Sequence, residues 1–144
     1  MVTNLIENHT NSFLHVLKEV GVNTTRDVNK GWCLGFAEFI LLHLENENYT
    51  SAEMLTNDYL VEGEELPDSS YVENFDEKEM AKYQISMNQY TAFKELVTKR
   101  NPNGIIGYHA WLYDRKTQKH YDIECPKGVE NVFDLPFFTR QIQF

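Results

Sequence analysis

One stretch of the chain, Cys33 to Leu44, combines a cysteine with an apolar run at helical spacing. Large apolar side chains recur from Phe36 onward at three- and four-residue steps, which predicts a helix with much of its surface buried. We expect this helix to end at about Leu44 or Glu45. A thiol in the first turn feels the positive end of the helix dipole, which favours the thiolate over the thiol. The stretch therefore predicts a core helix that opens with an activated cysteine.

Two further helices flank this one in the sequence. Residues 3–20 show apolar spacing typical of an amphipathic helix, and Gly21 is a natural stop. Residues 76–100 are predicted as a helix because their first turn is acidic and their last turn is basic. The helix that carries Cys33 is therefore expected to pack among other helices.

The segment from Glu45 to Glu79 is acidic. It holds more than half of the chain's 22 acidic residues and a single cation, Lys78. Its glycine, proline and paired serines interrupt regular structure. At 144 residues the chain has the length of one domain. We therefore predict a single domain, 1–144, in which residues 46–79 form an acidic, partly irregular insertion.

The C-terminal part of the chain is strand-like. Residues 105–113 are rich in β-branched and aromatic side chains, and residues 119–125 follow after a polar turn as a partner strand. A turn at 126–128, a bend at 134–138 and a last strand at 139–144 complete the expected order. Helices followed by strands predict an α+β fold, in which N-terminal helices, the Cys-bearing helix included, pack on a C-terminal antiparallel sheet.

Strand alternation decides which side chains of this sheet can meet. An even register between the two strands places His109 on the same face as Asp122 and Glu124. Pairing of Asp114 with Lys119 around a four-residue loop gives such a register, with His109 opposite Glu124 and diagonal to Asp122. A shift by two residues puts His109 opposite Asp122. In both registers a carboxylate can fix the tautomer of the histidine.

A thiol at a helix start, a strand histidine and a neighbouring carboxylate are the parts of a nucleophilic triad. The histidine, His109, would take the thiol proton of Cys33, and the carboxylate would orient the ring. The backbone N–H of Cys33 would help to hold the oxyanion, with Asn29 and the Trp32 indole as candidates for a second donor. Trp32 and Trp111 are the candidates for the wall of the cleft.

Three runs of the chain resemble the papain-like thiol hydrolase superfamily, with NlpC-type peptidases and transglutaminase-like proteins as the most similar branches. The runs are Gly31-Trp32-Cys33-Leu34-Gly35-Phe36-Ala37-Glu38-Phe39, Tyr108-His109-Ala110-Trp111-Leu112 and His120-Tyr121-Asp122-Ile123-Glu124. The resemblance covers about residues 29–45 and 105–138. It implies a papain-like fold with Cys33 as nucleophile, His109 as base and Asp122, rather than Glu124, as the third residue.

The predicted function is therefore that of a cysteine hydrolase or acyl transferase. Such an enzyme acts on an amide or isopeptide bond of a peptide or another amide-bearing molecule, and the acidic segment would favour a basic one. The alternative is a non-catalytic, small acidic binding protein that inhibits or modulates a basic protein partner. That protein would use the 45–79 surface, including Glu62, Glu64, Glu65 and Asp68, and would keep the triad only as architecture. The oligomeric state is left open.

Charge and composition exclude several other classes. The net charge is −9 and no block of Lys or Arg occurs, so we expect no nucleic acid partner. No apolar run has the length of a membrane span, and the start of the chain has no basic region followed by an apolar core. We therefore expect no membrane partner and a cytoplasmic location.

A metal site or cofactor is not expected either. Cys33, His109, His120 and Cys125 lack the close ligand spacing of common structural zinc sites. Gly-rich phosphate loops are absent from the sequence. His120 is expected to be exposed near the end of the hairpin.

Overall fold

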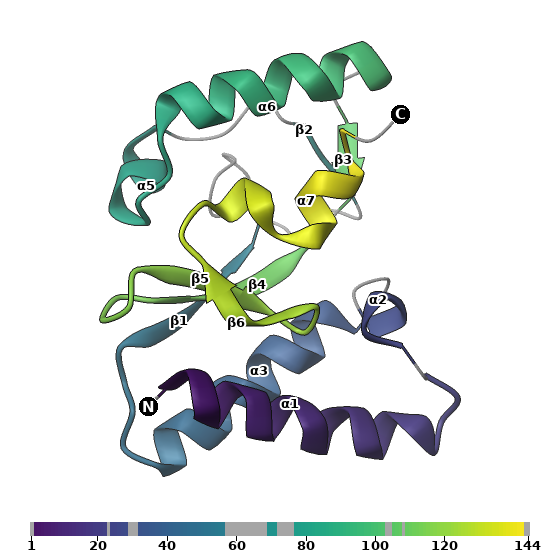
Figure 1. The fold of residues 1–144 in the computed structure, drawn as a ribbon, viewed down its shortest axis with the longest axis vertical. Coiled ribbons are helices and arrows are strands. Elements are labelled where there is room, and N and C mark those ends of the chain that lie inside the picture. Colours follow the sequence, from purple (N-terminus) through teal and green to yellow (C-terminus); the bar gives the residue numbers. More distant parts are fainter. Residues whose placement is uncertain are drawn as a thin grey trace.

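The computed structural model describes residues 2–22, 24–28, 32–56, 69–71, 77–102, 105–107 and 109–142. Its α-helices are α1 (Val2–Lys18), α2 (Thr25–Val28), α3 (Cys33–Asn46), α5 (Glu77–Lys82), α6 (Met87–Arg100) and α7 (Pro136–Arg140). Its strands are β1 (Ala52–Thr56), β2 (Ser69–Tyr71), β3 (Ile105–Gly107), β4 (Ala110–Asp114), β5 (Lys119–Asp122) and β6 (Cys125–Val129), and η2 (Val132–Asp134) is a short 3-10 helix. The predicted α+β fold is confirmed, with helices in the N-terminal part and an antiparallel sheet built mainly from the C-terminal part (Figure 1).

The main sheet has four antiparallel strands in the order β1-β4-β5-β6. Strands β4 and β5 pair with Asp114 opposite Lys119, which is one of the two registers that the sequence allows. The register is even, so His109 precedes β4 on the same side of the sheet that carries Asp122. A separate two-stranded sheet pairs β2 with β3.

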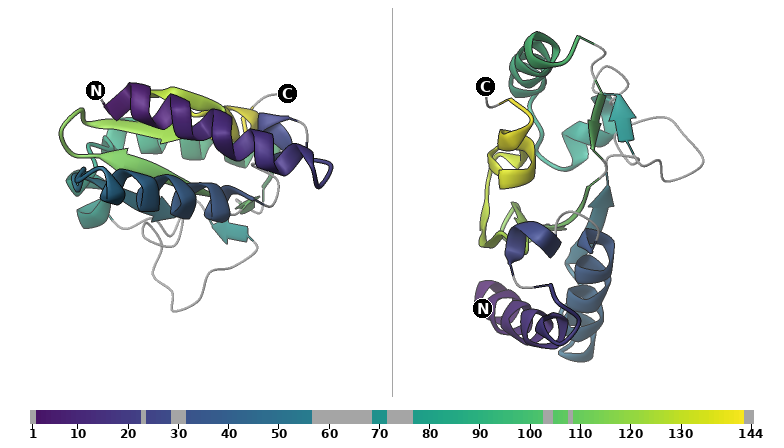
Figure 2. Two further views of the ribbon diagram at one scale, coloured as in Figure 1. Left: turned by 90° about the horizontal axis from the view of Figure 1, so that it is seen from below. Right: turned by 90° about the vertical axis from the view of Figure 1, so that its right-hand side faces the viewer.

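Helices cover both faces of the main sheet (Figures 1 and 2). One face packs against α1 and α3, and the buried residues between them include Ile6, Phe36, Ile40, Leu112 and Tyr121. We call this the α3-side core. The other face packs beneath α6, η2 and α7, and its buried residues include Phe93, Trp111, Tyr113, Phe133 and Phe138. We call this the α7-side core. Successive residues of β4 enter opposite cores, as strand alternation requires.

The helix predicted for residues 76–100 is in fact two helices. α5 ends at Lys82, and α6 begins at Met87. Gln84, between them, adopts a left-handed conformation with φ 61°, which interrupts a right-handed helix. Ser86 then accepts hydrogen bonds from the N–H groups of Asn88 and Gln89, so that it caps α6. The charges at the two ends of residues 76–100 gave no sign of this break, which the Ser86 cap marks.

The C-terminal prediction was wrong in several places. The strand predicted for 105–113 divides between β3, in the two-stranded sheet, and β4, in the main sheet, and the strand predicted for 119–125 ends at Asp122. Residues 126–128, expected as a turn, lie in β6, which pairs with β5. The bend expected at 134–138 lies in η2 and in α7, which begins with Pro136 at its first position. Proline is well suited to that position because it lacks the N–H that the first turn leaves without a partner. Of the strand expected at 139–144, residues 139–140 belong to α7, residues 141–142 form a turn, and residues 143–144 lie outside the described residues.

Part of the acidic segment is regular. Residues 52–56 form β1, the edge strand that pairs with β4, with Leu55 buried in the α7-side core. The strand was missed because its neighbours in sequence are strongly polar. Glu62, Glu64, Glu65 and Asp68, on which the alternative function depends, lie outside the described residues.

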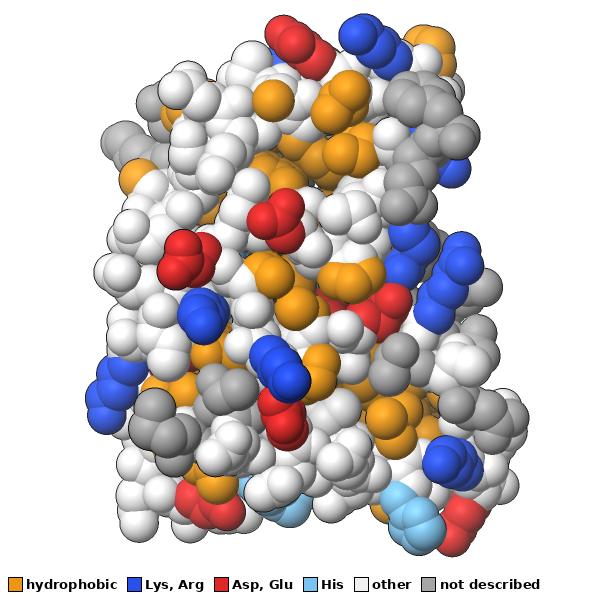
Figure 3. Space-filling view, in the orientation of Figure 1, with side chains coloured by type: hydrophobic (Ala, Val, Ile, Leu, Met, Phe, Trp, Pro, Cys, Tyr) orange, Lys and Arg blue, Asp and Glu red, His pale blue; other side chains and the backbone are white. Residues whose placement is uncertain are grey.

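Acidic and basic side chains are intermixed on the face of the molecule shown in Figure 3. No described helix is long and apolar enough to cross a membrane.

Candidate active site

Cys33 is the first residue of α3 and is 5% exposed. The residue before it, Trp32, is held by two backbone hydrogen bonds: its N–H donates to the carbonyl of Val28, and its carbonyl accepts from the N–H of Phe36. Hydrogen bonding from the backbone N–H groups of Ala110 and Leu34 lowers the pKa of the Cys33 thiol. The first turn of a helix leaves such N–H groups without partners inside the helix, and its dipole favours a negative charge there.

His109 directly precedes β4 and is completely buried. Its Nε2 lies 3.0 Å from Oδ2 of Asp122. Because a carboxylate oxygen only accepts, Nε2 carries the proton, and in the neutral ring Nδ1 keeps a free lone pair. Among the described residues, Nδ1 has no partner with normal hydrogen-bond geometry. The nitrogen that a general base needs is therefore available.

Asp122 ends β5 and is also completely buried. Its two oxygens have different partners: Oδ2 faces His109, and Oδ1 accepts the backbone N–H of Glu124 at 3.0 Å. A buried carboxylate is costly unless such partners surround it. The turn after β5 thus holds the carboxylate toward the ring.

The thiol and the imidazole shift each other's pKa. Burial alone would raise the pKa of the Cys33 thiol, but hydrogen bonding and charge attraction to His109 outweigh it, so that the pKa is lowered. Burial alone would lower the pKa of His109, but its interactions with Asp122 and Cys33 outweigh it, so that the pKa is raised. Both shifts favour a thiolate beside an imidazolium.

The contact between Cys33 and His109 is loose. The two groups interact strongly enough to shift both pKa values, yet Nδ1 has no partner with normal hydrogen-bond geometry among the described residues. Catalytic hydrogen bonds are often long in the free enzyme and shorten when substrate binds. The loose contact is therefore compatible with proton transfer between sulfur and ring.

Glu124, the competing candidate for the third residue, has another partner. Its two carboxylate oxygens accept from Nη1 and Nη2 of Arg140, at 2.7 Å and 2.6 Å. A bidentate pair of this kind satisfies the carboxylate and directs it toward α7. Asp122 is therefore the carboxylate that contacts His109.

Trp111, a candidate for the cleft wall, lies in the α7-side core. Its side chain is completely buried, and its indole N–H donates to Nδ1 of His120 at 3.0 Å. Nε2 of His120 in turn donates to the carbonyl of Tyr83. His120, expected to be exposed, is completely buried, and burial lowers its pKa to about 4. These two residues are part of the core because the α5–α6 turn covers their face of the sheet.

The three candidates for the donor that would hold the oxyanion differ in where the structure places them. The backbone N–H of Cys33 lies at the N-terminus of α3, as expected. Trp32 is 44% exposed, and its side chain makes no capping hydrogen bond. Asn29 lies outside the described residues. Trp32 is therefore an exposed aromatic side chain immediately before Cys33.

Sequence reasoning missed two features of the site. Phe137 of α7 stacks on His109, with ring centroids 4.4 Å apart and an angle of 14° between the planes. The Glu124–Arg140 pair joins the turn after β5 to the same helix. The charges of Glu124 and Arg140 are complementary, but their separation of 16 residues follows no local period. No sequence signal pointed to Phe137.

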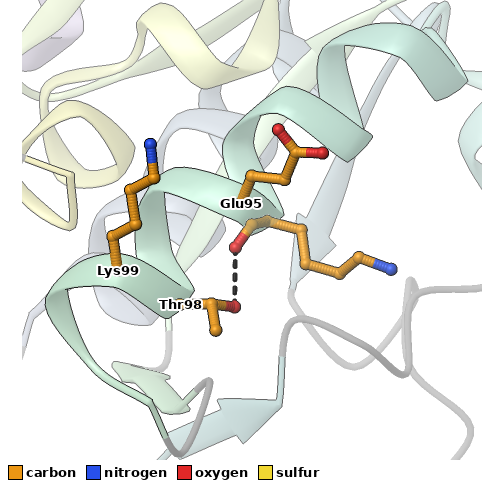
Figure 4. A pocket seen from close by; sticks show the side chains of 4 residues that line it. Glu95, Thr98 and Lys99 are labelled. Carbon is orange, nitrogen blue, oxygen red and sulfur yellow. Dashed lines mark hydrogen bonds between the residues drawn. The ribbon is translucent and has the colours of Figure 1, made fainter.

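Two surface pockets lie away from this site. One, of about 530 Å³, is lined by Lys94, Glu95, Thr98 and Lys99 of α6 (Figure 4). The other, of about 630 Å³, is lined by Gln84, Ser86, Gln89, Val129, Glu130, Asn131 and Asp134. Neither contains a cysteine or a histidine. In the part of the chain that the structure describes, no group of three or more His, Cys, Asp or Glu side chains is placed to hold a metal ion.

Comparison of the chain with protein-family models, with curated proteins and with solved structures finds no significant match in any of the three. The chemistry of the site therefore rests on its own geometry.

Proposed function

We propose that the protein is a papain-like cysteine hydrolase or acyl transferase that acts on an amide or isopeptide bond. The observation that carries this proposal is the 3.0 Å contact between Asp122 and His109, together with the mutual pKa shifts of His109 and of the Cys33 thiol at the N-terminus of α3. The pKa of that thiol is lowered although the side chain is buried. A structural cysteine in an apolar core has the opposite shift.

The first half of the reaction forms an acyl-enzyme. The Cys33 thiolate attacks the carbonyl carbon, and the oxyanion forms near the N-terminus of α3, where the backbone N–H of Cys33 is a donor. The carbon–nitrogen bond then breaks, and the His109 imidazolium gives its proton to the departing amine. Asp122 holds the ring and stabilises its charged form throughout.

In the second half, neutral His109 takes a proton from the next nucleophile. Water gives hydrolysis, and an amine gives acyl transfer; either attacks the thioester carbon and releases the Cys33 thiolate. The same residues serve both outcomes, so the substrate that reaches the site decides between them.

The reactivity of the two cysteines tests this proposal directly. Cys33 has a lowered pKa, whereas burial, helped by the charge of Asp122, raises the pKa of the half-buried Cys125. Iodoacetamide should therefore alkylate Cys33 much faster than Cys125 at pH 6 to 7, as measured by mass spectrometry of peptides. Equal and slow labelling of both thiols would contradict the proposal.

Acyl transfer is tested with an aryl ester. p-Nitrophenyl acetate should give a burst of p-nitrophenolate and an acetylated protein in the intact mass spectrum. Cys33→Ala should abolish both signals while circular dichroism stays unchanged, and Cys125→Ala is the matched control that should retain them. If Cys33→Ala keeps the burst, Cys33 is not the nucleophile.

The alternative of an acidic binding protein makes a different prediction for the same variant. Binding to a basic partner would survive Cys33→Ala and would weaken as salt is added. No observation on the described residues favours that function, so it is not proposed.

A further inference from the structure

The short helix α7 covers the candidate base. It lies on the face of the sheet opposite α3 (Figure 1). The ring of its Phe137 is nearly parallel to the His109 imidazole, with ring centroids 4.4 Å apart. Phe138, the next residue, meets the same imidazole edge-on at 6.2 Å. Both phenylalanines are buried in the α7-side core. The orientation of the His109 ring thus depends on where α7 lies.

One ion pair connects α7 with the other partner of His109. Arg140, the last residue of α7, holds Glu124 through two short hydrogen bonds, and the pair is largely buried. The backbone N–H of Glu124 donates to Oδ1 of Asp122. Arg140 also attracts the charge of Asp122 directly. The pair therefore holds the turn that directs Asp122 and the helix that covers His109.

The position of Arg140 is itself restrained from outside the site. A side-chain nitrogen of Arg100, the last residue of α6, donates to the backbone carbonyl of Arg140. Because α6 packs on η2 and α7 through Phe93, this contact joins the ion pair to a long helix of the same core.

We propose that Phe137 and the Glu124–Arg140 ion pair are positioning residues, which together hold the His109 ring and the Asp122 carboxylate in the geometry needed to keep Cys33 reactive. The inference rests on the proposed function. The three residues act through their contacts with His109 and with the turn that carries Asp122.

An ion pair and an aromatic stack elsewhere in the protein serve as controls. Variants of these groups distinguish the loss of a positioning contact from a general loss of stability. Arg115 donates to Glu53 at 2.7 Å, again joining two parts of the chain, but at the hairpin end that is remote from His109. Phe133 likewise stacks on an aromatic ring, that of Phe93 at 4.5 Å, in the same core as Phe137. These groups supply control variants of the same chemistry away from His109.

The first experiment measures the rate of iodoacetamide alkylation at Cys33 between pH 4 and 9. Glu124→Gln and Arg140→Gln should move the rise of this profile to higher pH, and a displacement of one pH unit lowers the rate about tenfold at pH values below the rise. The double variant should match the single ones, because either change breaks the same pair. Glu53→Gln and Arg115→Gln should keep the wild-type profile.

The second experiment makes the same comparison for the two phenylalanines. Phe137→Leu should shift the alkylation profile, whereas Phe133→Leu should lower the melting temperature by a similar amount and leave the profile in place. Leucine keeps most of the buried volume, so both variants should fold.

The outcomes distinguish this inference from the function on which it rests. If wild-type Cys33 is no more reactive than Cys125, both fail. If wild-type Cys33 is reactive and all profiles coincide with the wild type, the proposed function stands and the positioning role is overturned. Additive shifts in the double variant would overturn the ion-pair mechanism, because the two residues would then act separately.

Discussion

Two histidines on one face of the same sheet have opposite pKa shifts, although both are completely buried. His109 faces a carboxylate and a thiol, so the charged ring is stabilised and its pKa is raised. His120 lies between the Tyr83 carbonyl and the Trp111 indole. It is held neutral, and its pKa falls to about 4. Burial is equal, so the partners decide which histidine can do acid–base work.

The role of Asp122 can be tested at the residue level. Asp122→Asn should slow alkylation of Cys33 at pH 7 by about tenfold or more, because the amide cannot stabilise the imidazolium as a carboxylate does. The measurement is the pH profile of alkylation, with melting temperature recorded in parallel.

Asp114→Asn is the matched control for that substitution. Asp114 is equally buried in the same sheet, but its carboxylate accepts from the hydroxyl groups of Tyr49 and Ser51 and from the N–H of Thr117. Its loss should lower the melting temperature and leave the Cys33 profile unchanged. A slowed reaction in both variants would mean that the effect is general loosening of the sheet.

At the scale of the element, strand β6 illustrates how a glycine determines a local fit. Gly128 has φ 83°, and an added Cβ would lie 2.5 Å from Cε2 of Tyr121 on the neighbouring strand. Tyr121 is completely buried in the α3-side core. The position therefore requires glycine on two independent grounds.

Gly128→Ala should destabilise the protein by about 2 kcal/mol or more, because left-handed strain and overpacking add. Gly35→Ala is the matched control: Gly35 lies in α3, and an added Cβ would meet nothing within 4 Å. That variant should raise the free energy of unfolding by about 0.5–1 kcal/mol, because alanine is the better helix former. Urea denaturation measures both, and two changes of the same sign would contradict the prediction.

At the scale of the whole molecule, His120 connects the main sheet with helices α5 and α6. Its Nε2 donates to the carbonyl of Tyr83, which lies in the turn between α5 and α6. Protonation of the ring would place a charge in the α7-side core, next to Trp111 and Tyr113. The packing of α5 and α6 on the sheet should therefore weaken when His120 is protonated at low pH.

The stability should therefore fall as pH is lowered from about 6.5 to 4. Because the pKa of His120 is about 4 in the folded protein and 6.5 when unperturbed, the unfolded chain binds the extra proton in that window. The loss from this residue is about 3 kcal/mol. His109 acts in the opposite direction: its pKa is raised, so its contribution is present below 6.5 and is lost as pH rises through the folded value.

His120→Gln isolates the first effect. Glutamine can accept from Trp111 and donate to Tyr83, yet it does not titrate. The free energy of unfolding, measured by urea denaturation at several pH values, should therefore fall less between pH 6.5 and 4 than in the wild type. Parallel curves for the two proteins would show that His120 is not the source.

Periodicity and alternation are properties of a few neighbouring residues, and they were enough for a large part of this protein. Helical spacing located α1 and the start of α3 at Cys33, and the hairpin allowed the even register that puts His109 on the side of Asp122. The charges at the two ends of residues 76–100 could not divide α5 from α6, because the break depends on one left-handed residue and a serine cap.

Contacts between distant parts of the chain decided the rest. The strand pattern did not distinguish Glu124 from Asp122 as the partner of His109. In the folded protein Glu124 binds Arg140, and Asp122 contacts His109. The sequence predicted that His120 is exposed, but in the folded protein the turn between α5 and α6 covers its side chain. The physical reason is that a side chain's charge state and burial depend on which groups surround it in space, whereas local patterns describe only its neighbours along the chain.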